Sequence, residues 1–256
     1  MNSIISKLLW AVPICIFSDT SFAEDSKAAV EKGIISGNIG LVSKYIFRGG
    51  VENNDIAIQG GLDYAHQSGV SVGYWGSTLD YDATDENHAH GFEHDFYLAY
   101  AQQINQDWRY KLQTTVYVYQ NGGSVYGDSN DHRSTTAFDA LAEIGFKDLS
   151  LNASVMLADA SFANAGDVYL SATYNHVLTH DFNFKAVVGG SIYNSHHDDS
   201  LIQTTKDFAF NEARIGISKA IGDTGVTASF DHVFGGEDRL GHDYPNNEVF
   251  ALNYSF

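Results

Sequence analysis

The sequence is poor in cysteine, proline and positive charge, and each scarcity argues against a class of protein. It holds a single cysteine, Cys15, and 2 prolines among 256 residues. Cys15 lies in an N-terminal segment that we expect to be removed, so the mature chain would have no thiol for disulfides or thiol chemistry. The 14 Lys and Arg residues stand against 32 Asp and Glu residues, which gives a formal net charge of -18. Such a chain would repel phosphates, which argues against nucleic-acid binding.

The first 23 residues have the features of a secretory signal peptide. Lys7 supplies positive charge, residues 8–17 form a short apolar run, and Ser21 and Ala23 give the small-x-small pattern of a cleavage site. We predict cleavage after Ala23. A periplasmic lead-in over residues 24–35 and one β-rich domain over residues 36–256 would follow.

Long apolar runs are also missing, because no later segment approaches the ~18 consecutive apolar residues of a membrane helix. A membrane strand hides its apolar content, since lipid-facing and lumen-facing residues alternate along it. The 15 Tyr and 16 Phe residues favour strands. Twelve segments alternate with period two, most of them near the ~9–11 residues that a tilted membrane strand needs. They are residues 37–48, 56–66, 69–79, 94–103, 108–120, 138–146, 149–158, 167–177, 182–192, 208–220, 226–234 and 247–256.

The connections between these segments alternate between short and long. Short links lie at residues 67–68, 104–107, 147–148, 178–181 and 222–225, and links of 7 or more residues lie between them. A soluble β-sandwich could show the same two-faced strands, but its crossovers have no reason to keep this rhythm. The pattern therefore predicts an all-β fold, a transmembrane up-and-down antiparallel β-barrel of about 12 strands, with tight periplasmic turns and long outer loops.

The C-terminus carries a further pattern of alternating apolar residues. Phe250, Leu252, Tyr254 and Phe256 are spaced by two and end on a terminal phenylalanine. This pattern resembles the signal by which outer-membrane barrels are handed to the barrel assembly machinery. We therefore expect outer-membrane lipids and that machinery as partners.

The first three predicted strands carry a recognisable set of motifs. Ser43, Tyr45, Arg48 and Gly49 form a Ser-x-Tyr-x-x-Arg-Gly pattern, followed by Gln-Gly-Gly-Leu at residues 59–62 and Gly-Tyr-Trp-Gly-Ser at residues 73–77. This region resembles the TorF family of porin-like proteins, earlier catalogued as the conserved hypothetical family Gcw-chp. The resemblance implies a secreted barrel with a channel role. The chain departs from the family pattern after Arg-Gly, where Gly50, Val51 and Glu52 replace the usual Ser/Thr and Gln.

Charged residues on the predicted lumen face are mixed in sign. Facing lipid would cost about 2–4 kcal/mol for each Lys or Arg at mid-membrane, so an inward orientation is expected. The predicted lumen-lining residues are Lys44, Arg48, Asp63, Asp95, Arg109, Lys111, Tyr117, Tyr119, Asp139, Glu143, Asp167, Lys185, Glu212, Arg214 and Asp231. They indicate a polar aqueous path, and the alternative is a plugged barrel whose charges pair with each other.

Arg48 has two possible uses at the expected outer end of the first strand. It could guard the mouth of the barrel, or it could pair with a nearby carboxylate and hold the first loop. We favour the pairing.

The predicted outer loops hold most of the negative charge, for example Asp82, Glu86, Asp128, Asp198 and Asp199. An acidic mouth concentrates cations, so a mild cation preference is expected. Histidines gather in the same loops, and His88, His90, His196 and His197 are weak candidates for a metal site. Loop histidines without a rigid scaffold are usually solvated, and we assign no metal and no cofactor.

Three classes of function remain for such a barrel. The favoured one is a channel for passive diffusion of ions or small polar solutes. The second is a non-conducting structural or adhesive barrel that acts through its acidic loops. The third, a barrel enzyme, needs a nucleophile and a base at the rim. Neighbours such as Asp231 and His232 form no such signature, so we predict that the chain is not an enzyme and has no catalytic residue.

Overall fold

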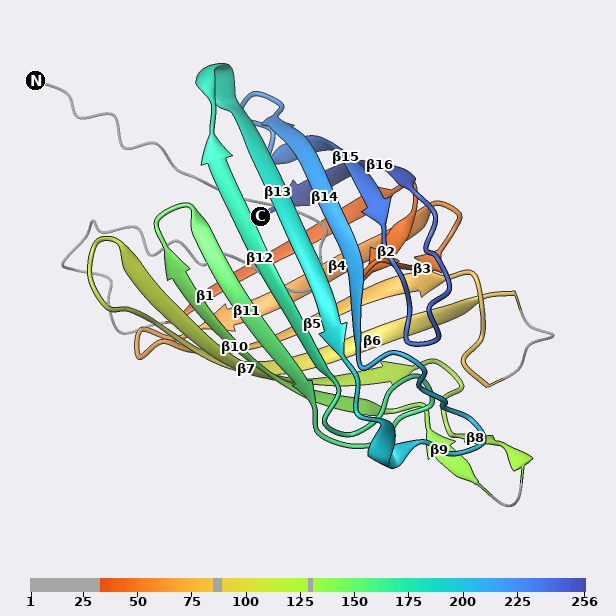
Figure 1. Ribbon diagram of the computed structural model, residues 1–256. Helices are drawn as coiled ribbons and strands as arrows, with labels where there is room; N and C mark the ends of the chain where they lie inside the picture. Colours follow the sequence, from red (N-terminus) through yellow and green to blue (C-terminus); the bar gives the residue numbers. More distant parts are fainter. Residues whose placement is uncertain (1–32, 85–88, 129–130) are drawn as a thin grey trace, which may run out of the picture.

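The chain folds into one closed β-barrel, drawn in Figure 1. The computed structural model describes residues 33–84, 89–128 and 131–256, so the predicted signal peptide and His88 lie outside the described residues. Consecutive wall strands pair antiparallel, and β1 closes the ring by pairing with both β4 and β16. Within the described part of the chain, no helix is long and apolar enough to cross a membrane.

The wall contains twelve strands, which confirms the predicted up-and-down fold. They are β1 (Ile34–Val42), β4 (Ala57–Ala65), β5 (Val70–Leu79), β6 (Gly91–Gln103), β7 (Trp108–Tyr119), β10 (Ala137–Phe146), β11 (Leu149–Met156), β12 (Val168–Val177), β13 (Phe182–Ile192), β14 (Phe208–Ala220), β15 (Val226–Gly235) and β16 (Asn247–Ser255). β1 begins inside the predicted lead-in, because Ile34 and Ile35 pair with Ala65 and Tyr64. Short turns connect the strands at one end of the barrel, the turn end, and long loops connect them at the other, the loop end.

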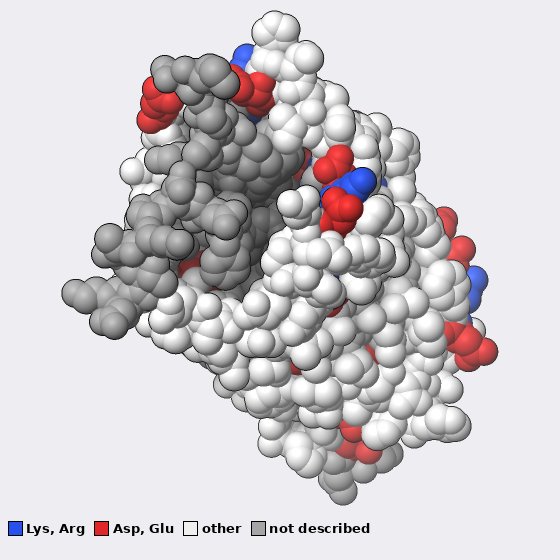
Figure 2. Space-filling view, turned by 90° about the vertical axis from the view of Figure 1, so that its left-hand side faces the viewer, with Lys and Arg blue, Asp and Glu red and all other residues white. Residues whose placement is uncertain are grey.

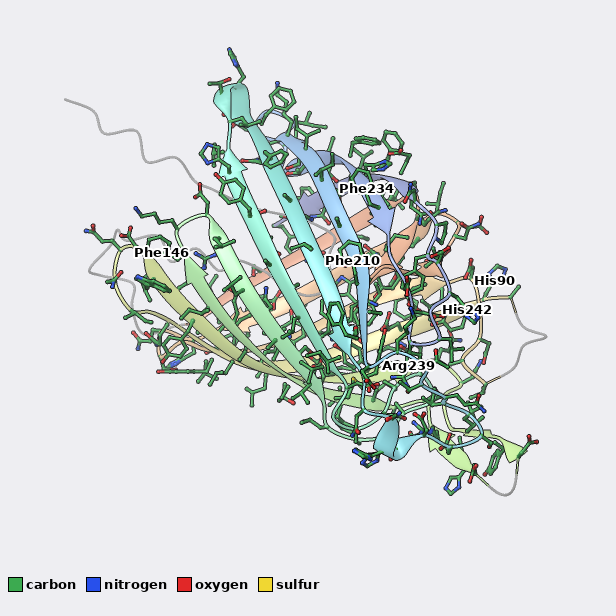
Figure 3. The ribbon with its side chains drawn as sticks, viewed as in Figure 1. His90, Phe146, Phe210, Phe234, Arg239 and His242 are labelled. Atoms are coloured by element: carbon green, nitrogen blue, oxygen red, sulfur yellow. The ribbon has the colours of Figure 1, made fainter. Side chains whose placement is uncertain are left out.

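Alternation sorts the side chains between the inside and the outside of the wall. On β7, Leu112 is 53% exposed while its neighbour Gln113 is 8% exposed. Figure 2 shows a wall largely free of charged residues, with Asp, Glu, Lys and Arg gathered toward the rims. Aromatic side chains stand out from the wall in Figure 3, with Phe146 near the turn end and Phe210 and Phe234 nearer the loop end. An apolar outer band with aromatic residues at its edges is the surface that a bilayer requires of a barrel.

The predicted C-terminal pattern lies on this outer face. Phe250, Leu252, Tyr254 and Phe256 are all exposed, whereas Val249, Ala251 and Asn253 between them are buried. Phe250 packs against Phe230 of β15, with 4.8 Å between ring centroids. The four residues therefore form one outward apolar stripe along β16.

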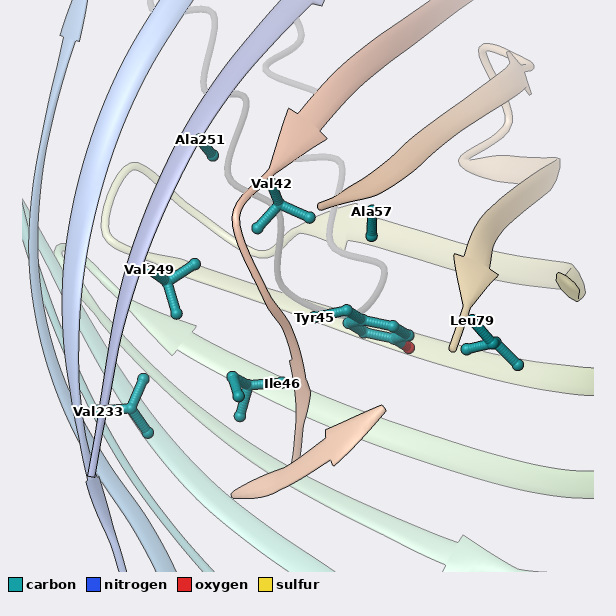
Figure 4. Packing of buried hydrophobic residues seen from close by; sticks show 8 residues of the cluster. All are labelled: Val42, Tyr45, Ile46, Ala57, Leu79, Val233, Val249 and Ala251. Atoms are coloured by element: carbon teal, nitrogen blue, oxygen red, sulfur yellow. The ribbon is translucent and has the colours of Figure 1, made fainter. Parts of the chain in front are cut away.

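The first predicted strand is wrong beyond residue 42. Instead of continuing along the wall to Arg48, the chain bends at Ser43 and Lys44 and enters the barrel as a hairpin of β2 (Tyr45–Phe47) and β3 (Gly50–Asn53). Figure 4 shows Tyr45 and Ile46 inside the ring of strands, with Ile46 toward Val233 and Tyr45 toward Leu79. These residues share one buried apolar cluster with Val42, Ala57, Val249 and Ala251. The inward hairpin, residues 45–53, gains this burial, which fits the run of three apolar residues at 45–47.

β14 contains a bulge that changes its alternation. The register with β13 shifts between Gly189 and Gly190, and Asn211 and Glu212 are consecutive buried residues. The extra residue re-aims the following side chains. Both Glu212 and Arg214 consequently face inward, together with Asn211.

The loops at the loop end are tied together by one buried arginine. A small hairpin of β8 (Ser124–Tyr126) and β9 (His132–Ser134) projects there (Figure 1), and Arg133 is the middle residue of β9. The Arg133 side chain pairs with Asp199 at 2.6 Å and donates to the backbone oxygens of Ala160, Ala163 and His197. Hydrogen bonds to a buried guanidinium are strong, so this contact joins three loops.

Candidate functional site in the lumen

The inward hairpin begins after Ser43, which keeps two hydrogen bonds to Phe250 of β16. Its N–H donates to the Phe250 carbonyl at 2.8 Å, and its Oγ accepts from the Phe250 N–H at 2.9 Å. β16 thus stays hydrogen-bonded while the first chain leaves the wall. Lys44 adds a bond from its Nζ to Asn247 Oδ1 at 2.7 Å.

The tip of the inward hairpin is a two-residue turn made by Arg48 and Gly49. Both have positive φ, 48° and 87°, which is the backbone that tight hairpins need. A Cβ on Gly49 would lie 2.4 Å from the Asn211 carbonyl oxygen. The hairpin therefore reaches from β1 and β4 across the lumen to the bulge of β14, and only glycine fits at the contact.

Arg48 fixes the tip against the opposite part of the wall. Its Nη2 donates to Asp139 of β10 at 3.1 Å and to Ser154 of β11 at 3.0 Å. The guanidinium also lies over the rings of Phe47 and Tyr169, 4.7 and 4.9 Å from their centroids. Arg48 pairs with a carboxylate as predicted, but it does so inside the lumen and not at the end of a wall strand.

Tyr45 attaches the base of the same hairpin. Its hydroxyl donates to Glu93 of β6 at 3.0 Å, and its ring packs edge-on against Trp75, with centroids 5.5 Å apart. Ser43, Tyr45, Arg48 and Gly49 thus each have a distinct structural task. The sequence motif at residues 43–49 encodes an obstruction of the lumen.

One part of the lumen wall, β4 to β7 with β10, is acidic. Its inward residues include five carboxylates, Asp63, Glu93, Asp95, Asp139 and Glu143, against two cations, Arg109 and Lys111. Tyrosines solvate several of the acids: Tyr97 donates to Asp63, Tyr119 to Glu93 and Tyr117 to Asp139. Asp95 is 1% exposed, and its Oδ1 has no hydrogen-bond partner among the described residues. We call this region the acidic wall.

The facing region, β13 to β15, holds equal numbers of acids and bases. Arg214 lies 3.0 Å from Glu212 and 3.8 Å from Asp231, and Lys185 lies 3.9 Å from Asp231. Tyr169 donates to Glu212 at 2.9 Å. We call this region the balanced wall. In the strand order β14 stands six positions from β6, so the two regions face each other across the barrel.

The remaining predicted residues lie near the two ends. Arg109 of β7 donates to Ser150 and to the Lys147 carbonyl at the turn end, with Glu143 at 3.9 Å. Lys111 pairs in register with Glu143 on the neighbouring strand. Asp167 lies at the loop end, where it pairs with Arg239. All of the predicted lining residues therefore fall inside the barrel or at its loop-end rim.

Sequence patterns gave no indication of the residues that close the loop end. A cavity of about 330 Å³ lies on the loop side of the inward hairpin, and Phe47, Arg48 and Glu52 line it together with Tyr81, Arg239 and Tyr244 from two loops. Burial and the charge of Asp80 raise the pKa of Glu52, although the Tyr81 hydroxyl bound to it lowers it. Loop residues carry no periodicity, so this set could be found only in three dimensions.

The histidines form no metal centre in the part of the chain that the structure describes, where no three His, Cys, Asp or Glu residues cluster in the manner of a metal site. His197 pairs with Asp159 at 3.1 Å, and His196 and His90 are exposed. Asp231 faces the lumen, whereas His232 pairs on the outside with Glu248 at 2.7 Å. Across the described ranges, no histidine is bonded to both a carboxylate and a hydroxyl, the arrangement of a hydroxyl–histidine–carboxylate triad.

Solved structures with the same fold are outer-membrane channels. The barrel is similar to the KdgM porin, with a TM-score of 0.50, 6% identity, and coverage of 86% of this chain and 98% of that one. It is also similar to an outer membrane channel from Pseudomonas putida F1, with a TM-score of 0.51, 10% identity, and coverage of 90% and 98%. At these identities the likeness concerns the fold alone.

Sequence comparison places the chain more narrowly. No curated protein matches it significantly. The family model described as "Bacterial protein of unknown function (Gcw_chp)" matches residues 27–250, which include the inward hairpin and all twelve wall strands up to Phe250. The chain belongs to the Gcw_chp family.

Proposed function

We propose that this protein is an outer-membrane porin-like channel whose narrowest part is formed by the inward hairpin. The observation that carries the proposal is the closed twelve-stranded barrel with charged residues inside and apolar residues outside. Carboxylates and guanidinium groups in the lumen fit a water-filled path, because charges facing hydrocarbon are costly. The porin fold of the two neighbours supports the same conclusion.

The proposal includes an export route and partners. A signal peptide at residues 1–23, an outer-membrane location, surrounding lipids and recognition of the C-terminal stripe by the assembly machinery all follow from a porin role. The resemblance of residues 36–77 to the TorF family agrees with it. The solutes would be ions or small polar molecules that move down their own gradients, so no cofactor is needed.

We further propose a mild preference for cations. The acidic wall has an excess of three negative charges, and Arg48 of the hairpin offsets one of them. Fixed charges in a narrow, low-dielectric channel attract counter-ions more strongly than the same charges on an open surface. The acidic loops add to the effect at the loop end.

One observation favours a second candidate, a non-conducting structural or adhesive barrel. The inward hairpin crosses the lumen, and Arg133 ties three loops over the same end. If the hairpin closes the lumen completely, the loops would be the functional surface.

Single-channel recording in planar lipid bilayers separates the two. The folded protein is added to one side of a membrane with a potassium chloride gradient. We expect discrete steps in the current, and a reversal potential whose sign indicates that potassium passes more readily than chloride. Silence from protein whose folding is verified by heat-modifiable gel migration would contradict the channel, and chloride preference would contradict the role of the acidic wall.

A further inference from the structure

The cavity on the loop side of the inward hairpin has two poles of opposite charge. Four charged residues line it, Arg48, Glu52, Asp167 and Arg239, and Arg48 and Asp167 have ion-pair partners in Asp139 and Arg239. We call Arg239 the positive pole and Glu52 the negative pole. The cavity lies toward the loop end of the lumen, where Figure 3 places Arg239. Its volume of about 330 Å³ suits a small organic molecule.

The positive pole offers a donor that the described residues do not use. Arg239 donates through Nη2 to Asp167, and its guanidinium lies 4.7 Å from the centroid of the Tyr193 ring. Its Nη1 is buried and has no hydrogen-bond partner among the described residues. A buried charged N–H without an acceptor is unfavourable, and a carboxylate oxygen is its best complement.

The negative pole is surrounded by aromatic rings. Glu52 accepts a hydrogen bond from Tyr81 at 2.6 Å, and the rings of Tyr81, Tyr119 and Phe47 line the same space. A carboxylate beside aromatic faces attracts an ammonium group through both charge and cation–π interaction. Burial raises the pKa of Glu52, and the charge of Asp80 adds to the shift.

Tyr244 lies between the poles. Its hydroxyl is 3.7 Å from the position of a Cβ on Gly50, and its pKa is raised by burial, by Tyr193, by Asp238 and by Glu52, while Arg239 lowers it. Because Glu52, Arg239 and Tyr244 line one cavity of about 330 Å³, one small molecule in it can contact both poles.

We propose that this cavity binds a small zwitterion, with its carboxylate on Arg239 and its ammonium group beside Glu52. A simple anion would satisfy Arg239 but leave its other end near Glu52 and Asp80. A simple cation would have the opposite conflict with Arg239. The inference rests on the proposed channel function for its biological meaning, since it names a solute class for the same path, but binding can be measured without conduction.

The test is isothermal titration calorimetry on folded protein in detergent with three ligands of matched carbon number. The ligands are 4-aminobutanoate, butanoate and butylamine. We expect 4-aminobutanoate to bind about tenfold or more tightly than either analogue, because one charge-assisted contact is worth that factor. Equal or tighter binding of an analogue would overturn the proposal, and so would failure of 4-aminobutanoate to bind at millimolar concentration.

Two variants test which residue binds which end of the ligand. Arg239→Gln should weaken 4-aminobutanoate without weakening butylamine, while Glu52→Gln should weaken 4-aminobutanoate without weakening butanoate. Lys147→Gln and Glu248→Gln, at exposed positions outside the cavity, are the charge-matched controls, and heat-modifiable migration verifies folding. If both cavity variants bind like their controls, the site is wrong. Binding without conductance would contradict the channel alone, and conductance without binding would contradict only this inference.

Discussion

The balanced wall and the acidic wall, which face each other across the lumen, stabilise their buried charges in different ways. On the balanced wall, Lys185 and Arg214 lie within 4 Å of acids on β14 and β15, so opposite charges are compensated locally. On the acidic wall, tyrosine hydroxyls and the Arg48 guanidinium of the hairpin bind the carboxylates, and an excess of negative charge remains. The first arrangement compensates each charge within the wall, whereas the second leaves negative charge in the lumen and holds the hairpin.

The largest predicted difference between the two walls is in the free energy of unfolding after a charge is removed. Arg214→Met should lower the free energy of unfolding by about 3–5 kcal/mol, because it leaves Glu212 and Asp231 buried without their shared partner. Asp95→Asn on the acidic wall should cost little or stabilise, since it removes an uncompensated charge. Urea unfolding followed by tryptophan fluorescence measures both. A loss for Asp95→Asn as large as that for Arg214→Met would remove the distinction between the walls.

The next effect concerns the contact between the hairpin and the acidic wall. A double-mutant cycle of Arg48→Ala and Asp139→Asn should give a coupling free energy of about 1–3 kcal/mol, the range for contacting residues in one network. The same unfolding assay applies. Additive losses would mean that the tip is held by apolar packing alone. Arg48→Lys should recover only part of the coupling, because an ammonium group lacks the planar fork.

The preference for cations over anions should change when charges are removed from the acidic wall. Asp95→Asn combined with Glu93→Gln should move the reversal potential toward zero, because two fixed charges leave the lumen. Glu248→Gln, which removes an exposed acid on the outer face, is the control. The difference should shrink as salt concentration rises, since screening shortens the range of the charges. An unchanged potential in the double variant would place the selectivity in the loops.

The smallest expected difference in the free energy of unfolding is between two tyrosine variants whose hydroxyl groups lie at equal distances from their acceptors. Tyr117 and Tyr169 donate to Asp139 and Glu212, each at 2.9 Å. Tyr117→Phe should cost about 1 kcal/mol or more, whereas Tyr169→Phe should cost less, because the hydrogen bond of Tyr117 is buried and that of Tyr169 is only partly buried. Unfolding midpoints at constant slope provide the measurement. The reverse order would contradict our view of which wall depends on its tyrosines.

The strands of the wall could be predicted from the sequence because the alternation of polar and apolar residues in each strand indicates which side chains face the lumen. The alternation at Leu112 and Gln113 and the rhythm of short and long links are local features, and they gave the strand number and the lumen face. The bulge at Asn211 also has a local signal, since Asn211 and Glu212 interrupt the alternation between Phe210 and Ala213.

The inward hairpin and the loop-end cavity could not be predicted in the same way. Tyr45, Ile46 and Phe47 are apolar in succession, which breaks the alternation of the preceding strand but does not say where the chain goes. Only the contacts with Phe250, Glu93 and Asp139 from distant strands decide that the chain turns inward. Arg133 and Arg239 lie in loops without periodicity, so their partners are fixed only when the barrel closes. Local patterns determine the barrel, and long-range contacts determine what narrows it.

The most direct test of this account is the conductance of a barrel with a shortened hairpin. Residues 46–51 are replaced by a short Gly-Ser link, and a variant with a similar replacement in the segment that joins β8 and β9 is the control. We predict clearly larger single-channel steps for the first variant and wild-type steps for the control. Unchanged conductance in a folded variant without the hairpin would contradict the claim that residues 43–49 form the constriction.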